Sequence, residues 1–333
     1  MPSVSSTTKR LLAAALAVGC LFAAGPGRAD TYPSRPITLV VPFVPGVPID
    51  LAARRLGQAL TEILRQPVVI ENRPGAGGIP GSTYVSKATP DGYTLLAATQ
   101  STHAINVGLY KSLPYDPIKD FTPISRISTA PNVLVVNPGL KVKTLAELIA
   151  LAKKRAAEGK PLTFASGGNG TTSHIAPELL KQAAGIDLVH IPYKGSSQGV
   201  MDVISGQVDM VFGPIAVVRG FVDKGALDAL VITSDKRSPL MPQVPTVDEA
   251  GLKSAEMSVW MAIYAPPGTP EPIIAILSKA INEAGEVKSL KEGFIADGSD
   301  VVTDKSPADF VKFNKEEIDR WVKVVKASGA TVD

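Results

Sequence analysis

The sequence contains few of the residues on which several classes of protein depend. Its 333 residues include a single cysteine, which excludes a disulfide scaffold, an iron–sulfur cluster and a cysteine-rich zinc site. Aromatic residues amount to 5%, too few for a platform on which nucleic-acid bases stack. The formal net charge of +3 is too small to indicate the basic stripe of a nucleic-acid-binding protein.

The residues that are present are typical of a globular protein built from many short elements. Hydrophobic residues make up 45% of the chain and charged residues 20%, a balance that permits a packed core. The 29 glycines and 28 prolines indicate that shaped turns divide the chain into short helices and strands. The length favours about two domains.

The first 29 residues have the three parts of a secretory signal peptide. Lys9 and Arg10 form a basic start, an uncharged apolar run follows over residues 11–24, and a small-residue cleavage pattern ends at Ala29. The apolar run is shorter than the roughly 20 residues that cross a bilayer. We therefore predict export to the periplasm with cleavage after Ala29. Lipidation at Cys20 is the alternative, and the position of Cys20 inside the apolar run disfavours it.

This leader also carries the whole net charge of the chain. Without Lys9, Arg10 and Arg28, the 34 basic residues become 31, which equals the number of acidic residues. The mature chain is therefore formally neutral, and it has no cysteine. No later stretch has about 18 apolar residues in a row without a charge, so we expect no membrane span in it.

From residue 37 onward, short apolar runs alternate with longer amphipathic stretches. This alternation predicts an α/β fold with parallel strands and helices on both faces of each sheet. Breaks near residues 128–131 and 255–258 suggest two lobes, with lobe I formed by residues 30–128 plus 258–333 and lobe II by residues 129–257. Strands are predicted at residues 37–43, 68–71, 93–98, 124–128, 133–137, 162–165, 188–191, 208–212, 227–232 and 258–265. Helices are predicted at residues 50–64, 81–88, 144–157, 271–286 and 308–327.

Four turns that follow predicted strands are rich in glycine and small polar residues. They lie at residues 43–50, 98–103, 166–174 and 193–197. In an open parallel sheet, ligands bind beyond the carboxyl ends of the strands, where glycine lets backbone amides approach and helix starts offer free N–H groups. One such loop is usually only a tight turn, but four at equivalent positions favour a binding site for a carboxylate.

Other kinds of site find little support. The glycine-rich stretch at residues 75–81 fails as a dinucleotide fingerprint because Pro80 stands where the third glycine belongs. His103, His174 and His190 have no metal-ligand spacing, so we predict no metal and no cofactor. His174 is interpreted as a residue that orients the loop at 166–172. Without a nucleophile or paired carboxylates, an enzyme is not predicted.

Several motifs, in order along nearly the whole mature chain, resemble the Bug family. These are periplasmic solute-binding proteins of tripartite tricarboxylate transporters. The motifs are Pro33-Ser34-Arg35-Pro36-Ile37, Glu71-Asn72-Arg73-Pro74-Gly75-Ala76-Gly77-Gly78, Pro90-Asp91-Gly92-Tyr93, Leu113-Pro114-Tyr115-Asp116-Pro117, Tyr193-Lys194-Gly195 and Ala265-Pro266-Pro267-Gly268-Thr269-Pro270.

The resemblance implies a two-lobed type II periplasmic binding protein fold with a ligand cleft between the lobes. It implies a monomer that captures a small organic carboxylate and delivers it to membrane permease subunits. A sensor partner of a membrane kinase remains an alternative, and an exported enzyme a less favoured one. The expected ligand-binding residues are Val44, Pro45, Gly46, Val47, Ile49, Asp50, Ser101, Thr102, His103, Ser166, Gly168, Gly170, Thr171, Tyr193 and Gly213.

Three positions depart from the family pattern. Val47 stands where the family usually has glycine, Ile49 replaces a hydroxyl residue, and Gly213 replaces an aspartate. Each change removes polar or flexible character from the expected pocket. We therefore predict a ligand more apolar than citrate or glutamate, such as an aromatic or long-chain mono- or dicarboxylate.

Overall fold

The computed structural model describes residues 32–328, and residues from Arg35 onward form one compact unit. The predicted signal peptide, its cleavage site and Cys20 lie outside the described residues. Within residues 32–328, no helix is both long and apolar enough to cross a membrane.

The first part of the chain builds three parallel strands with helices between them. β1 pairs with β2 on one side and with β3 on the other. Helix α2 is amphipathic: Ala53, Leu56 and Leu60 are buried, and Arg65 ends the helix in the left-handed conformation. The elements are β1 (Ile37–Val41), α2 (Pro48–Leu64), β2 (Val68–Asn72), η1 (Ala76–Gly78), α3 (Ile79–Ser86), β3 (Thr94–Thr99), η2 (Ser101–Ile105) and α4 (Asn106–Leu109).

The middle part contains a second set of parallel strands, β5, β6 and β7. The start of α5 has the predicted capping box, in which Thr144 and Glu147 bond each other's backbone N–H groups. The elements are η3 (Pro138–Leu140), α5 (Leu145–Ala157), β5 (Leu162–Ser166), α6 (Thr172–Ala184), β6 (Leu188–Pro192), α7 (Ser196–Ile204), β7 (Met210–Pro214), α8 (Ile215–Asp223), β8 (Asp228–Ile232) and η4 (Lys253–Ala255).

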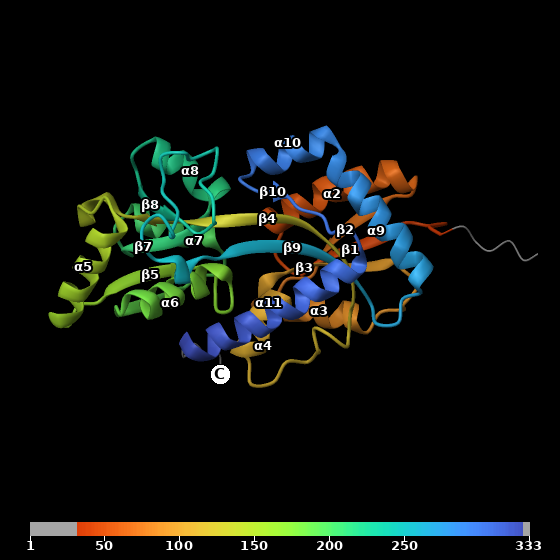
Figure 1. The fold of residues 1–333 in the computed structure, drawn as a ribbon, viewed down its shortest axis with the longest axis horizontal. Helices are drawn as coiled ribbons and strands as arrows, with labels where there is room; N and C mark the ends of the chain where they lie inside the picture. The colour runs from red at the N-terminus through yellow and green to blue at the C-terminus, as the bar shows by residue number, and fades with distance from the viewer. Residues whose placement is uncertain (1–31, 329–333) are drawn as a thin grey trace, which may run out of the picture. The chain divides into compact units, whose positions relative to one another are not determined.

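Two long antiparallel strands join the parallel sets, β4 (Thr122–Val136) and β9 (Ser258–Ala265). Figure 1 shows them side by side, with the segments around β5–β8 toward one end and those around β1–β3 toward the other. The order along the sheet is β2-β1-β3-β9-β4-β7-β5-β6, with β8 and β10 also paired to β4. The chain ends with α9 (Glu271–Glu286), α10 (Lys288–Ala296), β10 (Asp300–Val301) and α11 (Pro307–Ser328).

The largest hydrophobic core runs from one parallel set to the other. It joins Val40 and Leu96 of the first set to Phe164 of the second, and α11 contributes Phe310 and Trp321. Because α11 contacts α4, η2, β4 and α6, this helix holds both sets together along one side.

The α/β prediction is confirmed, and most predicted elements are present within two or three residues. The break predicted near residues 128–131 is wrong as a strand end, because β4 continues through it. There Ala130 and Pro131 pair only with β9, so one edge of the strand is open and a proline is tolerated. Helix α10 and strand β10 were not predicted. The lobe boundaries stay a prediction.

Candidate ligand-binding site

The strand register brings the carboxyl ends of the two parallel sets toward one stretch of β4. Thr99, at the end of β3, is level with Met261 of β9, which pairs with Ser128 of β4. Pro214, at the end of β7, pairs with Asn132 of β4. Four residues of strand, about 13 Å, separate these two levels. The loops that follow β3 and β7 therefore lie nearest to residues 128–132, which we call the crossover segment. The loops that follow β1, β5 and β6 open at the same strand ends, one or two strands further out.

The first predicted loop, residues 44–50, is organised around a buried carboxylate. Asp50 accepts hydrogen bonds from the backbone N–H of Gly46 at 2.9 Å, from Arg54 Nε at 2.9 Å and from Asn72 Nδ2 at 2.8 Å. Burial raises the pKa of Asp50, but these hydrogen bonds outweigh it and hold the pKa below its usual value of 3.8. Asp50 therefore shapes the loop from inside.

The outward side of this loop is apolar. The Val44 side chain is 43% exposed, while Val47 and Ile49 are partly exposed. Pro45 and Gly46 are exposed between them, and Gly46 has a φ of +83°. The loop can therefore offer backbone amides and aliphatic surface to a ligand, but no free charge of its own.

The second predicted loop is more deeply buried than the sequence suggests. Ser101, Thr102 and His103 are at most 5% exposed and form a turn of π-helix. The His103 ring stacks on Tyr264 with centroids 4.1 Å apart, and burial lowers its pKa to about 3. Thr102 Oγ1 accepts a hydrogen bond from the backbone N–H of Thr99. His103 thus lies in the core, where it supports the loop from within.

The third predicted loop, residues 166–172, is a closed network of small side chains. The Gly168 N–H donates to Ser166 Oγ at 3.1 Å, and Thr171 Oγ1 donates to the Gly168 carbonyl at 2.7 Å. The Gly167 N–H donates to Ser173 Oγ at 2.9 Å. Gly168 and Gly170 have φ values of +118° and +78°, a region that disfavours other residues.

Two stacked histidines hold this loop at both ends. Ser166 Oγ lies 2.6 Å from His190 Nε2, and the Gly170 N–H donates to His174 Nδ1 at 3.3 Å. The rings of His174 and His190 stack with centroids 4.1 Å apart. Since Nδ1 of His174 accepts a bond from an amide, this ring is neutral. The arrangement agrees with the loop-orienting role predicted for His174, whereas His190 was not among the predicted site residues.

We expect His174→Leu to loosen the loop, because it removes the acceptor of the Gly170 N–H. His174→Asn retains an acceptor at nearly the same place and should preserve the loop. Hydrogen–deuterium exchange should therefore be faster at residues 166–172 in His174→Leu than in His174→Asn. Equal exchange in both variants would contradict this role.

The same variants should change how stability depends on pH. Burial, helped by His190 and Lys181, lowers the pKa of His174 to about 3. Between about pH 6.5 and pH 3 the unfolded chain binds a proton that the folded chain excludes, so stability falls as the pH falls. Urea unfolding at pH 7 and pH 5 should show a smaller loss of stability in both variants than in the unmodified protein.

The third loop also contacts the first part of the chain through Asn106. A Cβ built on Gly170 would lie 3.1 Å from Asn106 Oδ1, and one built on Gly77 would lie equally close to the same oxygen. Asn106 Nδ2 donates to the Gly77 carbonyl at 2.8 Å. Two glycines from distant segments thus meet at one buried amide, a contact that sequence spacing does not reveal.

The remaining predicted residues lie beside the third loop or at the end of β7. The Tyr193 N–H donates to the Ser166 carbonyl, and Tyr193 Oη donates to Asp202 at 2.6 Å, so the hydroxyl is already engaged. A Cβ on Gly213 would approach Val218 Cγ1 to 2.5 Å. An aspartate at this position would therefore need the start of α8 to move.

Four helices begin beside the crossover segment without a side-chain cap. They are α2, α6, α7 and α8, whose first-turn N–H groups remain available to an anion. Helices α9 and α10 also begin without such a cap, so its absence alone does not define a site. The distinguishing feature of the four is their shared position at the strand ends.

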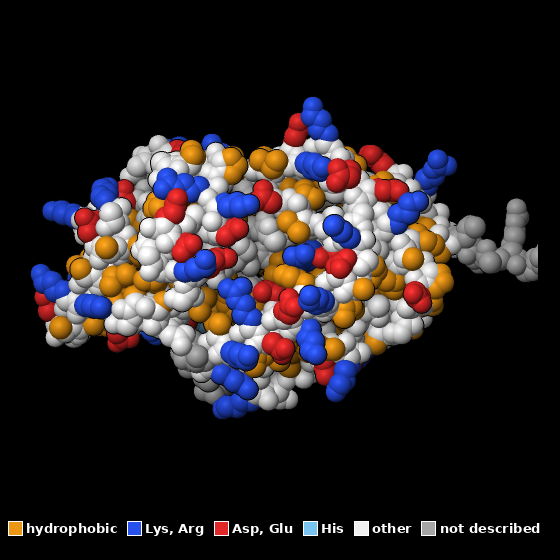
Figure 2. Space-filling model, in the orientation of Figure 1, with side chains coloured by type: hydrophobic (Ala, Val, Ile, Leu, Met, Phe, Trp, Pro, Cys, Tyr) orange, Lys and Arg blue, Asp and Glu red, His pale blue; other side chains and the backbone are white. Residues whose placement is uncertain are grey.

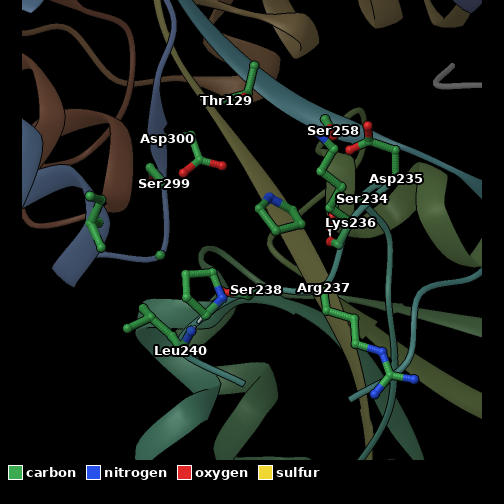
Figure 3. A pocket seen from close by; sticks show the side chains of 14 residues that line it. Thr129, Ser234, Asp235, Lys236, Arg237, Ser238, Leu240, Ser258, Ser299 and Asp300 are labelled. Carbon is green, nitrogen blue, oxygen red and sulfur yellow. Dashed lines mark hydrogen bonds between the residues drawn. The ribbon is translucent and has the colours of Figure 1, made fainter. Parts of the chain in front are cut away.

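A pocket of about 180 Å³ lies at the open edge of β4, between the start of β10 and the loop after β8, and Thr129 and Pro131 of the crossover segment line it. Figure 3 shows Asp300 extending toward the pocket, while the Arg237 guanidinium extends away. That guanidinium is paired with Glu249 at 2.8 Å. The pocket contains none of the predicted ligand-binding residues, and its lining includes two acidic and two basic residues, Asp235, Asp300, Lys236 and Arg237.

Figure 2 shows basic and acidic side chains interspersed over the face in view. Within residues 32–328, no cluster of three or more His, Cys, Asp or Glu side chains has the arrangement of a metal site. Any anion bound at the crossover segment would therefore be held by local amides and hydroxyls.

Opposed strand ends with glycine-rich loops and open helix starts are the arrangement of a solute-binding protein of the periplasmic binding class. The chain belongs to the tripartite tricarboxylate transporter family of receptors, whose model matches residues 52–330. It is thus a solute-binding protein and not an enzyme, as predicted.

Known proteins are similar to this chain over most of its length. Protein BugT of Bordetella pertussis is 41% identical over 308 residues, which cover 92% of this chain and 93% of BugT. MatC of Rhodopseudomonas palustris, solved with bound malate, superposes with a TM-score of 0.80 at 33% identity over 88% of this chain and 100% of that one. Rpa4515 of R. palustris, solved with adipate, gives 0.82 at 34% identity over 90% and 100%. The predicted Bug-family fold is confirmed.

Proposed function

We propose that this chain captures a small carboxylate with a larger apolar part than citrate or glutamate and delivers it to a tripartite tricarboxylate-type permease. The observation that carries this proposal is the first loop. Val44, Val47 and Ile49 present aliphatic surface there, while Asp50 is turned inward and paired with Arg54.

In this proposal the ligand carboxylate is bound without a basic side chain. The amides at the starts of α2 and α6 are the donors, while the hydroxyls of Ser166 and Thr171 are engaged within the loop and hold it in shape. Each hydrogen bond to a charged group contributes about 1.5–3 kcal/mol, so a few of them suffice for tight binding. Helix starts add a favourable field for an anion. The buried rings and hydroxyls of residues 101–103 support the pocket wall.

The relatives support a carboxylate ligand of this kind. MatC was solved with malate and Rpa4515 with adipate, whose two carboxylates are joined by four methylene groups. A chain whose first loop is aliphatic should favour the adipate type over the malate type, because each buried methylene contributes about 0.8 kcal/mol.

A thermal-shift screen of the purified protein tests the ligand class. The panel should include adipate, malate, citrate, hexanoate and benzoate, since a ligand that binds the folded state raises the melting temperature. We expect the largest rise from an acid with an extended aliphatic or aromatic part. A largest rise with citrate would contradict the apolar preference, and no rise with any carboxylate would contradict the ligand class.

We expect single alanine substitutions at Ser166 and Thr171 to weaken binding of the best acid by about tenfold each, because each removes a hydrogen bond that holds the loop, which must then be ordered during binding. Calorimetry measures the dissociation constants, and circular dichroism verifies the fold. Ser205→Ala is the matched control, because its hydroxyl only donates to the Asp202 carbonyl within α7. Unchanged affinity in both loop variants would place the site elsewhere.

Delivery and export can be tested in cells. Deletion of the gene should abolish uptake of the labelled acid, whereas retained uptake together with capture of a kinase sensor domain would favour the sensor role. Mass spectrometry of the protein from the periplasm should find Asp30 as its first residue. A lipid-modified Cys20 would contradict cleavage after Ala29.

A further inference from the structure

Two buried polar side-chain atoms without partners lie at the edges of the crossover segment. Asn132 is 1% exposed and Thr99 is 7% exposed, and neither Asn132 Nδ2 nor Thr99 Oγ1 has a hydrogen-bond partner within the described structure. A buried donor that bonds neither protein nor water is costly, so such atoms in a native protein call for an explanation.

The positions of the two atoms are related through the sheet. Thr99 ends β3, level with Ser128 of β4, and Asn132 lies four residues further along β4, opposite the end of β7. The two atoms thus flank the stretch toward which the strand-end loops open. The other unpartnered atoms of the described residues are Ser82 Oγ, Thr83 Oγ1, His103 Nε2, Asn106 Oδ1 and Tyr110 Oη, and the last two lie beside Gly77.

The backbones of both residues are already satisfied. The Asn132 N–H donates to Thr233 Oγ1 and its carbonyl accepts from the Thr233 N–H, while Thr102 Oγ1 bonds both the N–H and the carbonyl of Thr99. These contacts fix each residue in place and leave only the side chain to bind something else.

We propose that Asn132 Nδ2 forms a second polar contact in the ligand site, for an oxygen of the ligand remote from the carboxylate that the loops hold. An amide nitrogen only donates, so the ligand atom that satisfies it is an acceptor. Thr99 Oγ1 lies two strands and four residues away, too far to share that atom, so a ligand that bridges the site would meet it with a different oxygen. The chemical class is a second carboxylate or a carbonyl at the far end of an aliphatic or aromatic spacer. This inference rests on the proposed function and makes it more specific.

A matched pair of ligands and a matched pair of variants test this contact. Adipate and hexanoate have chains of the same length, but only adipate has a second carboxylate. Asn137 lies just beyond the end of β4, yet its amide is fully engaged: Nδ2 donates to Val203 and Ile204 carbonyls and Oδ1 accepts from the Gly139 N–H. Asn137→Ala is therefore the control for a merely structural asparagine.

We expect Asn132→Leu to weaken adipate binding at least about tenfold by calorimetry while leaving hexanoate binding unchanged. Without ligand, its melting temperature should equal or exceed that of the unmodified protein, because an unsatisfied donor has been removed. Asn137→Ala should show the reverse, with a lower melting temperature and unchanged affinity. Thr99→Val should weaken adipate binding in the same direction.

Asn132→Ala serves as a second variant if leucine at this position prevents folding. Unchanged adipate affinity in a folded Asn132 variant would overturn the proposal, as would an equal loss for adipate and hexanoate. If the unmodified protein binds adipate, either of these two results would contradict only the role of Asn132 and not the proposed function. Failure of every carboxylate to bind the wild type would contradict both.

Discussion

Asp50→Ala is expected to lower the free energy of unfolding by about 2–4 kcal/mol and to weaken carboxylate binding at least about tenfold. The substitution removes the carboxylate that accepts from the Gly46 N–H, Arg54 Nε and Asn72 Nδ2, and a hydrogen bond to a charged group contributes about 1.5–3 kcal/mol. Ligand affinity should fall because the loop at 44–50 must then be ordered during binding.

Urea unfolding and calorimetry with the best acid from the screen measure these two effects. Asp116→Ala is the matched control, since this aspartate also accepts backbone N–H groups, from Ile118 and Lys119, but lies in a different loop. It should lose some stability and keep its affinity. An Asp50 variant that binds the acid as tightly as the unmodified protein would show that the first loop does not form the site.

The low pKa of Asp50 gives this prediction a pH dependence. Because the folded state holds the pKa below 3.8, the stabilisation is present at neutral pH and is lost as the pH falls through the folded-state pKa. The difference in stability between Asp50→Ala and the unmodified protein should therefore shrink in acid. A constant difference down to pH 3 would contradict the assignment of a charged Asp50.

Glu317→Leu is expected to destabilise the protein by about 3 kcal/mol or more. Its buried carboxylate accepts hydrogen bonds from the indole nitrogens of Trp260 at 2.8 Å and Trp321 at 2.9 Å. Leucine would leave the Trp260 N–H buried without this acceptor, and the Trp321 N–H would keep only the Gln100 amide oxygen, which can lie 2.6 Å away. Since Trp260 pairs with Thr129 of β4, the substitution disturbs β9 where it passes the crossover segment.

Trp260 and Trp321 are the chain's two tryptophans, so fluorescence reports directly on this contact. In Glu317→Leu we expect altered tryptophan emission and unfolding at a lower urea concentration. Glu317→Gln retains an acceptor oxygen and should recover most of the stability. Equal destabilisation by glutamine and leucine would mean that the carboxylate charge, rather than acceptance from the indoles, is what matters.

Sequence patterns predicted a helix or strand correctly where residues close together in the sequence determine it. The capping box at Thr144 and Glu147 and the apolar stripe of α2 are such cases. Local sequence patterns gave a wrong prediction at Pro131, because whether a proline interrupts a strand depends on which strands pair with it. That pairing is set by the whole sheet and cannot be inferred from adjacent residues.

The candidate site shows the same limit. Glycine-rich turns after strands indicated the loops at 44–50 and 166–172, since backbone approach to a ligand requires small residues. Their partners are distant in sequence: His190 reaches Ser166, and Asn106 reaches both Gly77 and Gly170. Burial could not be foreseen either: His103 is fully buried and stacks on Tyr264, and its part in the ligand site stays a prediction.

Opening and closing of the site should be limited by the shared core. The core that includes α11 spans both parallel sets, and the contact of Gly170 with Asn106 lies between them. A ligand that bridges the loops at 44–50 and 166–172 would favour the closed population by its difference in affinity for the two states.

Hydrogen–deuterium exchange of the protein with and without its best acid tests the central claim most directly. We predict that the acid slows exchange at residues 44–50 and at residues 166–172 together, because it bridges amides of both loops. Protection confined to the pocket of Figure 3, at residues 234–240 and 298–300, would contradict the account.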